Sequence, residues 1–168
     1  VPAACFGEGG LQRGGNAVAG ALVDCAMRPI SPEDISSKWA KILRMNALEC
    51  LATLAQDECA RAAVFTPARA LGVVRALGAV LVAAAGPELP EGDQGLSPAI
   101  TTAALQLAGG LCQDAAVLGR TLLAEDDATA GEVAAAVAAL ARGVGRSRRG
   151  AEGWAEQAKV VVDAMDAA

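Results

Sequence analysis

The chain has 168 residues, of which 54% are hydrophobic and only 2% aromatic, and its formal net charge is −5. The acidic balance argues against a general binder of nucleic acid or of anionic membranes, and no uninterrupted apolar run reaches the ~20 residues that a membrane span needs. Alanine, the best helix former, supplies about a quarter of the residues. Because aromatic and β-branched residues are few, we predict an all-α protein.

The first predicted elements follow a glycine-rich segment, residues 1–15, which we expect to be flexible. A short helix over 16–27 comes next, with Asn16 as its N-cap. Residues 16–168 are predicted to form a single helical-repeat domain.

Three cap-then-proline pairs mark further helix starts, because a Ser or Thr side chain can cap a helix and proline fits its first position. These pairs are Ser31-Pro32, Thr66-Pro67 and Ser97-Pro98. They predict helices over 32–56, 66–85 and 97–112, the first of them bent or broken near Asn46.

Shorter elements are predicted from single capping residues. Asp57 can cap a helix that runs to Val64 or Phe65, and Asp114 begins a segment that ends near Leu123. Thr129 can cap a helix through Leu140. The remaining two elements are an acidic loop over 86–97 and a last helix over about 151–165.

One stretch of the sequence occurs twice. The motif Ala47-Leu48-x-x-Leu51-x-x-Leu54-Ala55-Gln56-Asp57 matches Ala104-Leu105-x-x-Ala108-x-x-Leu111-Cys112-Gln113-Asp114 at an offset of 57 residues. If the 86–97 loop is an insertion, the underlying period is about 45 residues, within the range of armadillo and HEAT repeats. Weaker copies fall at 17–22 and 137–142.

Residues 46–77 resemble the third helix of one armadillo repeat followed by the first two helices of the next, and residues 101–123 match in part. Arg61 and Val64 stand at the family's Arg-x-x-Val positions. The resemblance implies a short right-handed superhelix of armadillo-like repeats. The alternative is an Ala-rich four- or five-helix bundle, similar to a talin or vinculin rod segment.

One departure from the family limits what the resemblance implies. Some armadillo proteins bind extended basic peptides through a ladder of Trp and Asn on the third helix. The Trp positions correspond to Glu49 and Gln106, and the Asn positions to Thr53 and Gly110. The ladder is absent, so binding of nuclear-localisation signals is not implied.

The sequence holds little that points to catalysis. It has no histidine, the commonest general base and metal ligand. Its adjacent carboxylates lie at helix starts or turns, where capping explains them; they are Glu33-Asp34, Asp57-Glu58 and Glu125-Asp126-Asp127. The glycine pairs lack the residues of a phosphate-binding loop. We therefore predict no catalytic residue, cofactor or small-molecule substrate.

The five cysteines match no zinc template, so we predict no metal site. Cys50 and Cys112 fall on apolar stripes, which favours reduced, buried thiols in a cytoplasmic protein with no evident signal peptide. Cys59, near Arg61, is the best-placed thiol for redox chemistry.

Two groups of residues are candidates for binding a partner: a basic cluster and the two tryptophans. They are Arg142, Arg146, Arg148, Arg149, Trp39 and Trp154. The arginines suit an acidic surface or a phosphate, or simply a solvated loop. Each tryptophan suits an interface or the core.

Together these observations predict a non-enzymatic protein-interaction or scaffold module. Its expected partners are other proteins, acidic ones among them, or the rest of its own parent chain. The alternative function is a structural linker of the rod-bundle type.

Overall fold

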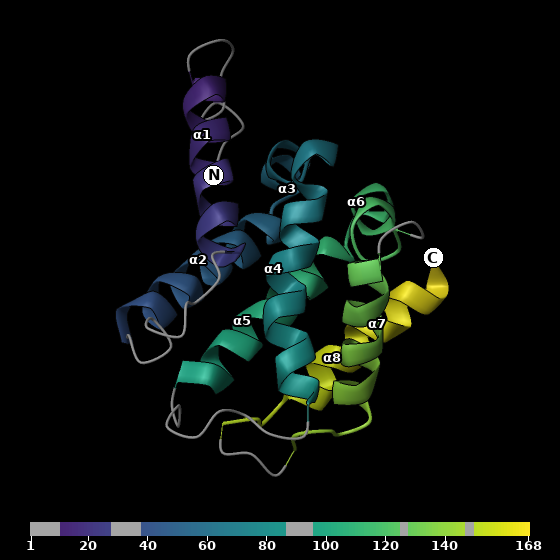
Figure 1. Ribbon diagram of the computed structural model, residues 1–168. Coiled ribbons are helices and arrows are strands. Elements are labelled where there is room, and N and C mark those ends of the chain that lie inside the picture. Colours follow the sequence, from purple (N-terminus) through teal and green to yellow (C-terminus); the bar gives the residue numbers. More distant parts are fainter. Residues whose placement is uncertain (1–10, 28–37, 87–95, 125–127, 147–149) are drawn as a thin grey trace.

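The computed structural model describes residues 11–27, 38–86, 96–124, 128–146 and 150–168. Within these residues the chain forms eight helices and no strand, which confirms the all-α prediction (Figure 1). The helices are α1 (Leu11–Met27), α2 (Lys38–Gln56), α3 (Glu58–Val64), α4 (Pro67–Ala85), α5 (Leu96–Leu111), α6 (Ala115–Arg120), α7 (Ala128–Ala141) and α8 (Trp154–Ala167).

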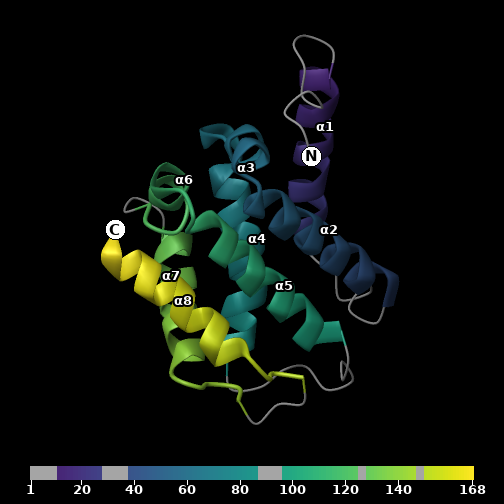
Figure 2. The ribbon, with the colours of Figure 1, turned by 180° about the vertical axis from the view of Figure 1, so that it is seen from behind.

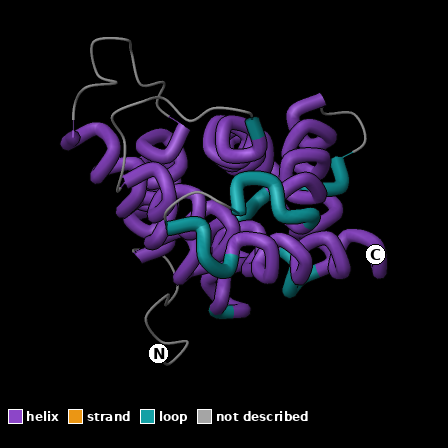
Figure 3. Tube along the Cα trace, turned by 90° about the horizontal axis from the view of Figure 1, so that it is seen from below, coloured by secondary structure: helices purple, strands orange, loops and turns teal. Residues whose placement is uncertain are grey.

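The long helices form two layers. α1, α4 and α7 lie next to one another in the layer nearer the viewer in Figure 1, and α2, α5 and α8 form the layer that faces the viewer in Figure 2. The contact between α2 and α5 is the most extensive of any helix pair, and α5 in turn packs on α8. Within the described residues, short turns join α2 to α3, α3 to α4 and α5 to α6, and Figure 3 shows the helices with the turns between them.

The two layers are joined by consecutive helix pairs. α1 packs on α2, α4 on α5 and α7 on α8, while the short helices α3 and α6 link one pair to the next. Among the described residues, α1 and α8 do not pack extensively on each other. The helix pairs are therefore arranged in series rather than around one central axis.

Several predicted helix starts are confirmed. Asp57 caps α3 by accepting a hydrogen bond from the Ala60 N–H at 2.8 Å. Asp114 caps α6 in the same way. Pro67 is the first residue of α4, as predicted, although the Thr66 side chain makes no capping hydrogen bond. The predicted break near Asn46 is wrong, because α2 is one continuous helix through that residue.

Other predicted boundaries are wrong. α1 begins at Leu11, so residues 11–15 are helical and Asn16 is not a cap. α5 includes residues 96–97 of the predicted loop. Thr129 lies inside α7, which begins one residue earlier.

α8 begins at Trp154, about three residues later than predicted. Its N-cap is Gly153, which has a φ of 85°, a conformation that favours glycine. The predicted ends at residues 27, 56, 64 and 85 match those of α1 to α4, whereas α6 ends at Arg120, earlier than the predicted end near Leu123. Any predicted boundary within residues 1–10, 28–37, 87–95 or 125–127 lies outside the described residues.

The weaker repeat copies are misplaced. Residues 17–22 lie in α1 and residues 137–142 in and just after α7, whereas the strong copies lie in α2 and α5. The two pairs belong to different layers. Alanine-rich helices share their apolar spacing, and this spacing alone does not distinguish one layer from the other.

The core is a single apolar cluster that runs through both layers. Small residues bring α2 and α5 close together: a methyl group added at Gly110 would lie 2.5 Å from the Ala55 Cβ. α4 is long and apolar enough to cross a membrane by length and composition. It lies at the centre of its layer, where Val73, Val74, Leu77, Val80 and Leu81 belong to the core, whereas Leu71 and Val82 are exposed.

Candidate functional site

A polar junction joins the two copies of the repeated motif. Gln113 donates from Nε2 to the Oε1 atom of Gln56 at 2.6 Å. The buried guanidinium of Arg61 donates to the Ala55 carbonyl at 2.6 Å and to Gln113 Oε1 at 3.1 Å. The Gln-Asp ending of the motif was visible in the sequence, but its role in joining the copies was not predicted.

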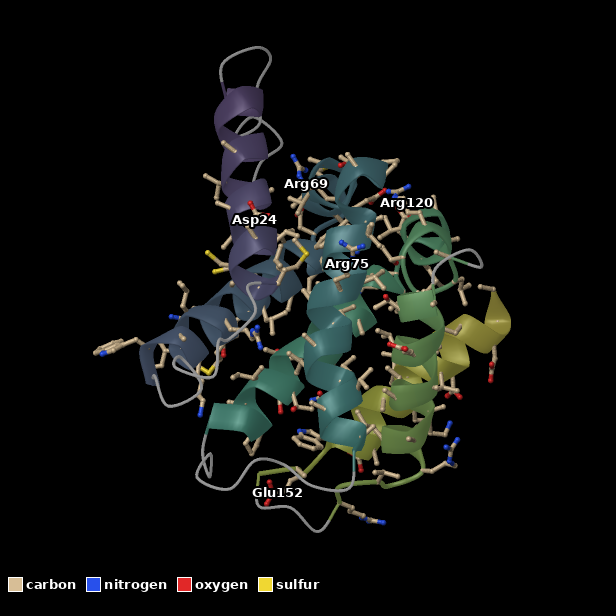
Figure 4. All side chains as sticks on the ribbon, in the orientation of Figure 1. Asp24, Arg69, Arg75, Arg120 and Glu152 are labelled. Carbon is tan, nitrogen blue, oxygen red and sulfur yellow. The ribbon has the colours of Figure 1, made fainter. Side chains whose placement is uncertain are left out.

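The short helices α3 and α6 are held together beside this junction. Arg120 of α6, labelled in Figure 4, donates from Nε to the carbonyl of Phe65, which follows α3, at 2.9 Å. The pKa of Asp114 is lowered chiefly by the hydrogen bond from the Val117 N–H. Its capping bond with Ala116 and the positive charges of Arg61 and Arg120 add to the lowering, while desolvation opposes it.

The side of α2 that no described helix covers carries an exposed stripe. Trp39 is 77% exposed and Leu43 is 46% exposed. Asn46, Cys50 and Thr53 continue the exposed line at helical spacing. We call these five residues the outward stripe.

A shallow hollow lies beside the outward stripe, between α1 and α2. Leu22 of α1 and Glu49, Cys50, Thr53 and Leu54 of α2 line it. Its walls are mainly apolar, which suits contact with an apolar side chain.

The predicted basic cluster is described only in part. Arg142 and Arg146 are exposed in the turn that follows α7, and Arg148 and Arg149 lie outside the described residues. Arg146 lines a hollow of about 370 Å³ at the start of α8. Glu152, labelled in Figure 4, and Glu156 line the same hollow, so its described charges are mixed rather than purely basic.

The two tryptophans differ in their exposure to solvent. Trp39 is exposed, whereas Trp154 is only 2% exposed and belongs to the core. The indole N–H of Trp154 donates to Thr102 Oγ1 at 3.1 Å, which ties α8 to α5. The prediction that Trp154 binds a partner is therefore wrong, because its ring is already enclosed by the protein.

The cysteines differ in exposure. Cys50 is exposed, contrary to the expectation of a buried thiol, because no described helix covers that side of α2. Cys112 is half-buried against the core, and desolvation raises its pKa to about 11. Cys59 is exposed, while the guanidinium of Arg61 is buried and directed at Ala55 and Gln113.

Two carboxylates at described helix starts serve as caps. Asp57 and Asp114 are helix caps, whereas Glu33-Asp34 and residues 125–127 lie outside the described residues. In the part of the chain that the structure describes, no three His, Cys, Asp or Glu side chains are placed to share a metal ion.

No family model, no curated protein and no solved structure matches this chain.

Proposed function

We propose that this chain is a non-enzymatic protein-interaction module built as a short armadillo-like stack of helical repeats. The order of its elements supports the stack. A short helix, a helix of the first layer and a helix of the second layer follow one another twice, as α3-α4-α5 and as α6-α7-α8. This order agrees with the three-helix repeat that residues 46–77 resemble.

The serial packing of the helix pairs favours the stack over the rod-like bundle. In a bundle of antiparallel helices around one core, the first and last helices come together. Here α1 packs on α2 and α4, and α8 packs on α5 and α7. A serial stack also offers extended faces to partners.

The outward stripe is the observation that carries the functional proposal. Trp39 and Leu43 expose large apolar surface one helical turn apart, and the mainly apolar hollow lined by Cys50 and Thr53 lies further along the same helix. Tryptophan is enriched among the residues that dominate binding energy at protein interfaces, and contiguous exposed apolar patches mark interaction sites. The lack of histidine in the whole sequence supports a role without general acid–base chemistry.

Arg142 and Arg146, with Arg148 and Arg149, are proposed as a second contact for acidic partners. Two exposed arginines stand in one turn after α7, where guanidinium groups can reach a carboxylate in a bidentate manner. Glu152 and Glu156 nearby reduce the local positive charge. We therefore rank this turn below the outward stripe.

The functional proposal is tested by affinity enrichment from extracts of the source cells with the full chain as bait. We expect a reproducible set of retained proteins whose amounts fall when all four arginines, or Trp39 and Leu43, are changed to Ala. Val160→Ala, an exposed apolar change on α8, is the matched control. A chain that retains no protein, stays monomeric in light scattering and binds no hydrophobic dye would contradict the proposal.

A further inference from the structure

The hollow at the start of α8 brings together charges of both signs. It lies where the turn after α7 meets α8, and its volume is about 370 Å³. That volume is near the lower end of the range of small-molecule sites, about 300–1,000 Å³. Its charged lining consists of Arg146 from the turn, Glu152 from the segment before α8 and Glu156 from the first turn of α8.

The three charged side chains of the hollow are not paired with one another. Within the described residues, Arg146 forms no ion pair with Glu152 or Glu156, and none of these three side chains makes a hydrogen bond. Further along α8 the opposite occurs, since Lys159 and Asp163 are joined at 2.7 Å. The hollow therefore offers a positive and a negative binding group to one ligand.

A ligand with charge of only one sign is disfavoured. An anion bound at Arg146 would face Glu152 and Glu156, and a cation bound at the glutamates would face the guanidinium. Like charges brought together in one site reduce affinity. A zwitterion, which carries both signs, can meet both kinds of group with charge-assisted hydrogen bonds.

The rest of the lining is largely apolar. Leu140, Ala151 and Trp154 line the hollow and belong to the core, and Val144 of the turn is 38% exposed. The indole N–H of Trp154 is already bound to Thr102, so this residue contributes apolar surface. Removing apolar surface from water is favourable, so this part of the hollow suits an apolar side chain.

We propose that the hollow binds a free α-amino acid with an apolar side chain. The guanidinium of Arg146 binds the carboxylate, to which it can donate two parallel hydrogen bonds. The carboxylates of Glu152 and Glu156 bind the ammonium group. The side chain of the amino acid lies against Leu140 and Val144. This site goes beyond the proposed interaction function and does not depend on it.

The test is isothermal titration calorimetry of the full chain at about pH 7, at which an α-amino group is largely protonated. The probes are L-leucine, N-acetyl-L-leucine, which lacks the ammonium group, and L-leucinamide, which lacks the carboxylate. We expect L-leucine to bind. Each of the other probes should bind at least about tenfold more weakly, because each loses a hydrogen bond between charged groups.

Variants of the charged lining locate the binding. Arg146→Ala should weaken the binding of L-leucine at least about tenfold, and so should Glu152→Gln combined with Glu156→Gln. Neither change removes a described hydrogen bond, so the thermal midpoint should stay close to that of the wild type.

Two control variants match these changes. Arg142→Ala removes an exposed arginine of the same turn that does not line the hollow, and Asp166→Asn removes an exposed acid of α8 away from it. Both should leave the affinity for L-leucine unchanged.

Four results would overturn the inference. They are no binding of L-leucine, equal binding of the three probes, an unchanged affinity in the Arg146→Ala variant, and tighter binding of glycerophosphocholine than of L-leucine. The last result would assign the hollow to a zwitterionic lipid head group. None of them bears on the proposed interaction function, because the titrations contain no partner protein.

Discussion

Gln113 donates its side-chain amide hydrogen to the side-chain oxygen of Gln56 across 2.6 Å, although 57 residues separate the two in the sequence. Each glutamine is the last residue but one of a copy of the repeated motif, and each precedes the aspartate that caps the next short helix. Equivalent ends of α2 and α5 therefore lie side by side. Arg61 of α3 donates hydrogen bonds to the Ala55 carbonyl and to the Gln113 side chain at this junction.

Arg61→Ala should destabilise the protein by about 2–3 kcal/mol, because it leaves the buried Ala55 carbonyl and the Gln113 side chain without a charged donor. Arg61→Lys should recover only part of this, since an ammonium group cannot match the planar guanidinium. Urea unfolding followed by circular dichroism measures both.

The control for Arg61 is Arg75→Ala on α4. Arg75 is exposed, as Figure 4 also shows, so its removal should change the free energy of unfolding by less than about 0.5 kcal/mol. Equal effects of the two changes would show that the hydrogen bonds of Arg61 do not stabilise the fold.

Asp114 should make stability depend on pH. Its pKa is lowered in the folded protein, so the unfolded chain binds the proton more readily and the stabilisation by its carboxylate is present above the ordinary Asp value of about 3.9. The stabilisation is lost as the pH falls through the folded pKa. Asp114→Asn keeps a capping oxygen without the charge, so its thermal midpoint should approach that of the wild type as the solution is acidified, and a constant difference would contradict this.

Truncation of the two tryptophans should change the free energy of unfolding by very different amounts. Trp154→Ala removes a fully enclosed ring and its bond to Thr102, and should cost about 3–5 kcal/mol. Trp39→Ala should change stability by less than about 0.5 kcal/mol, because that ring is mostly in water. The measurement is thermal unfolding of both variants, and similar losses would place Trp39 in the core.

The sequence predicted the helical class, the caps at Asp57 and Asp114 and the repeated motif, because these depend on local chemistry. It could not distinguish Trp39 from Trp154, since both stand at helical positions and only the neighbouring helices decide which is covered. For the same reason Cys50 was expected inside: its stripe matches that of α5, but no described helix covers it.

The start of α1 shows a different limit. The glycines among residues 11–15 have low helix propensity, which predicted a flexible segment. The helix nevertheless begins at Leu11. Packing of its later residues on α2 and α4 overrides local propensity.

The cysteines should differ in their reaction with iodoacetamide. Cys112, whose pKa is raised to about 11, holds almost no thiolate at pH 8, so its alkylation should be slow at that pH. The rate of alkylation should increase steeply as the pH is raised toward this pKa. The exposed Cys50 and Cys59 should be labelled first. Peptide mapping by mass spectrometry gives each rate, and rapid labelling of Cys112 in the folded chain would contradict its burial against the core.

The stacking of α2 on α5 is tested most directly by the free energies of unfolding of Gly109→Ala and Gly110→Ala, measured side by side. A methyl group at Gly109 meets nothing within 4 Å and should stabilise the helix by roughly 0.5–1 kcal/mol. At Gly110 the same methyl group would collide with Ala55 and should cost about 1–3 kcal/mol. Opposite signs at these neighbouring positions are the predicted result, and equal stabilisation by both changes would contradict the close packing of α2 on α5.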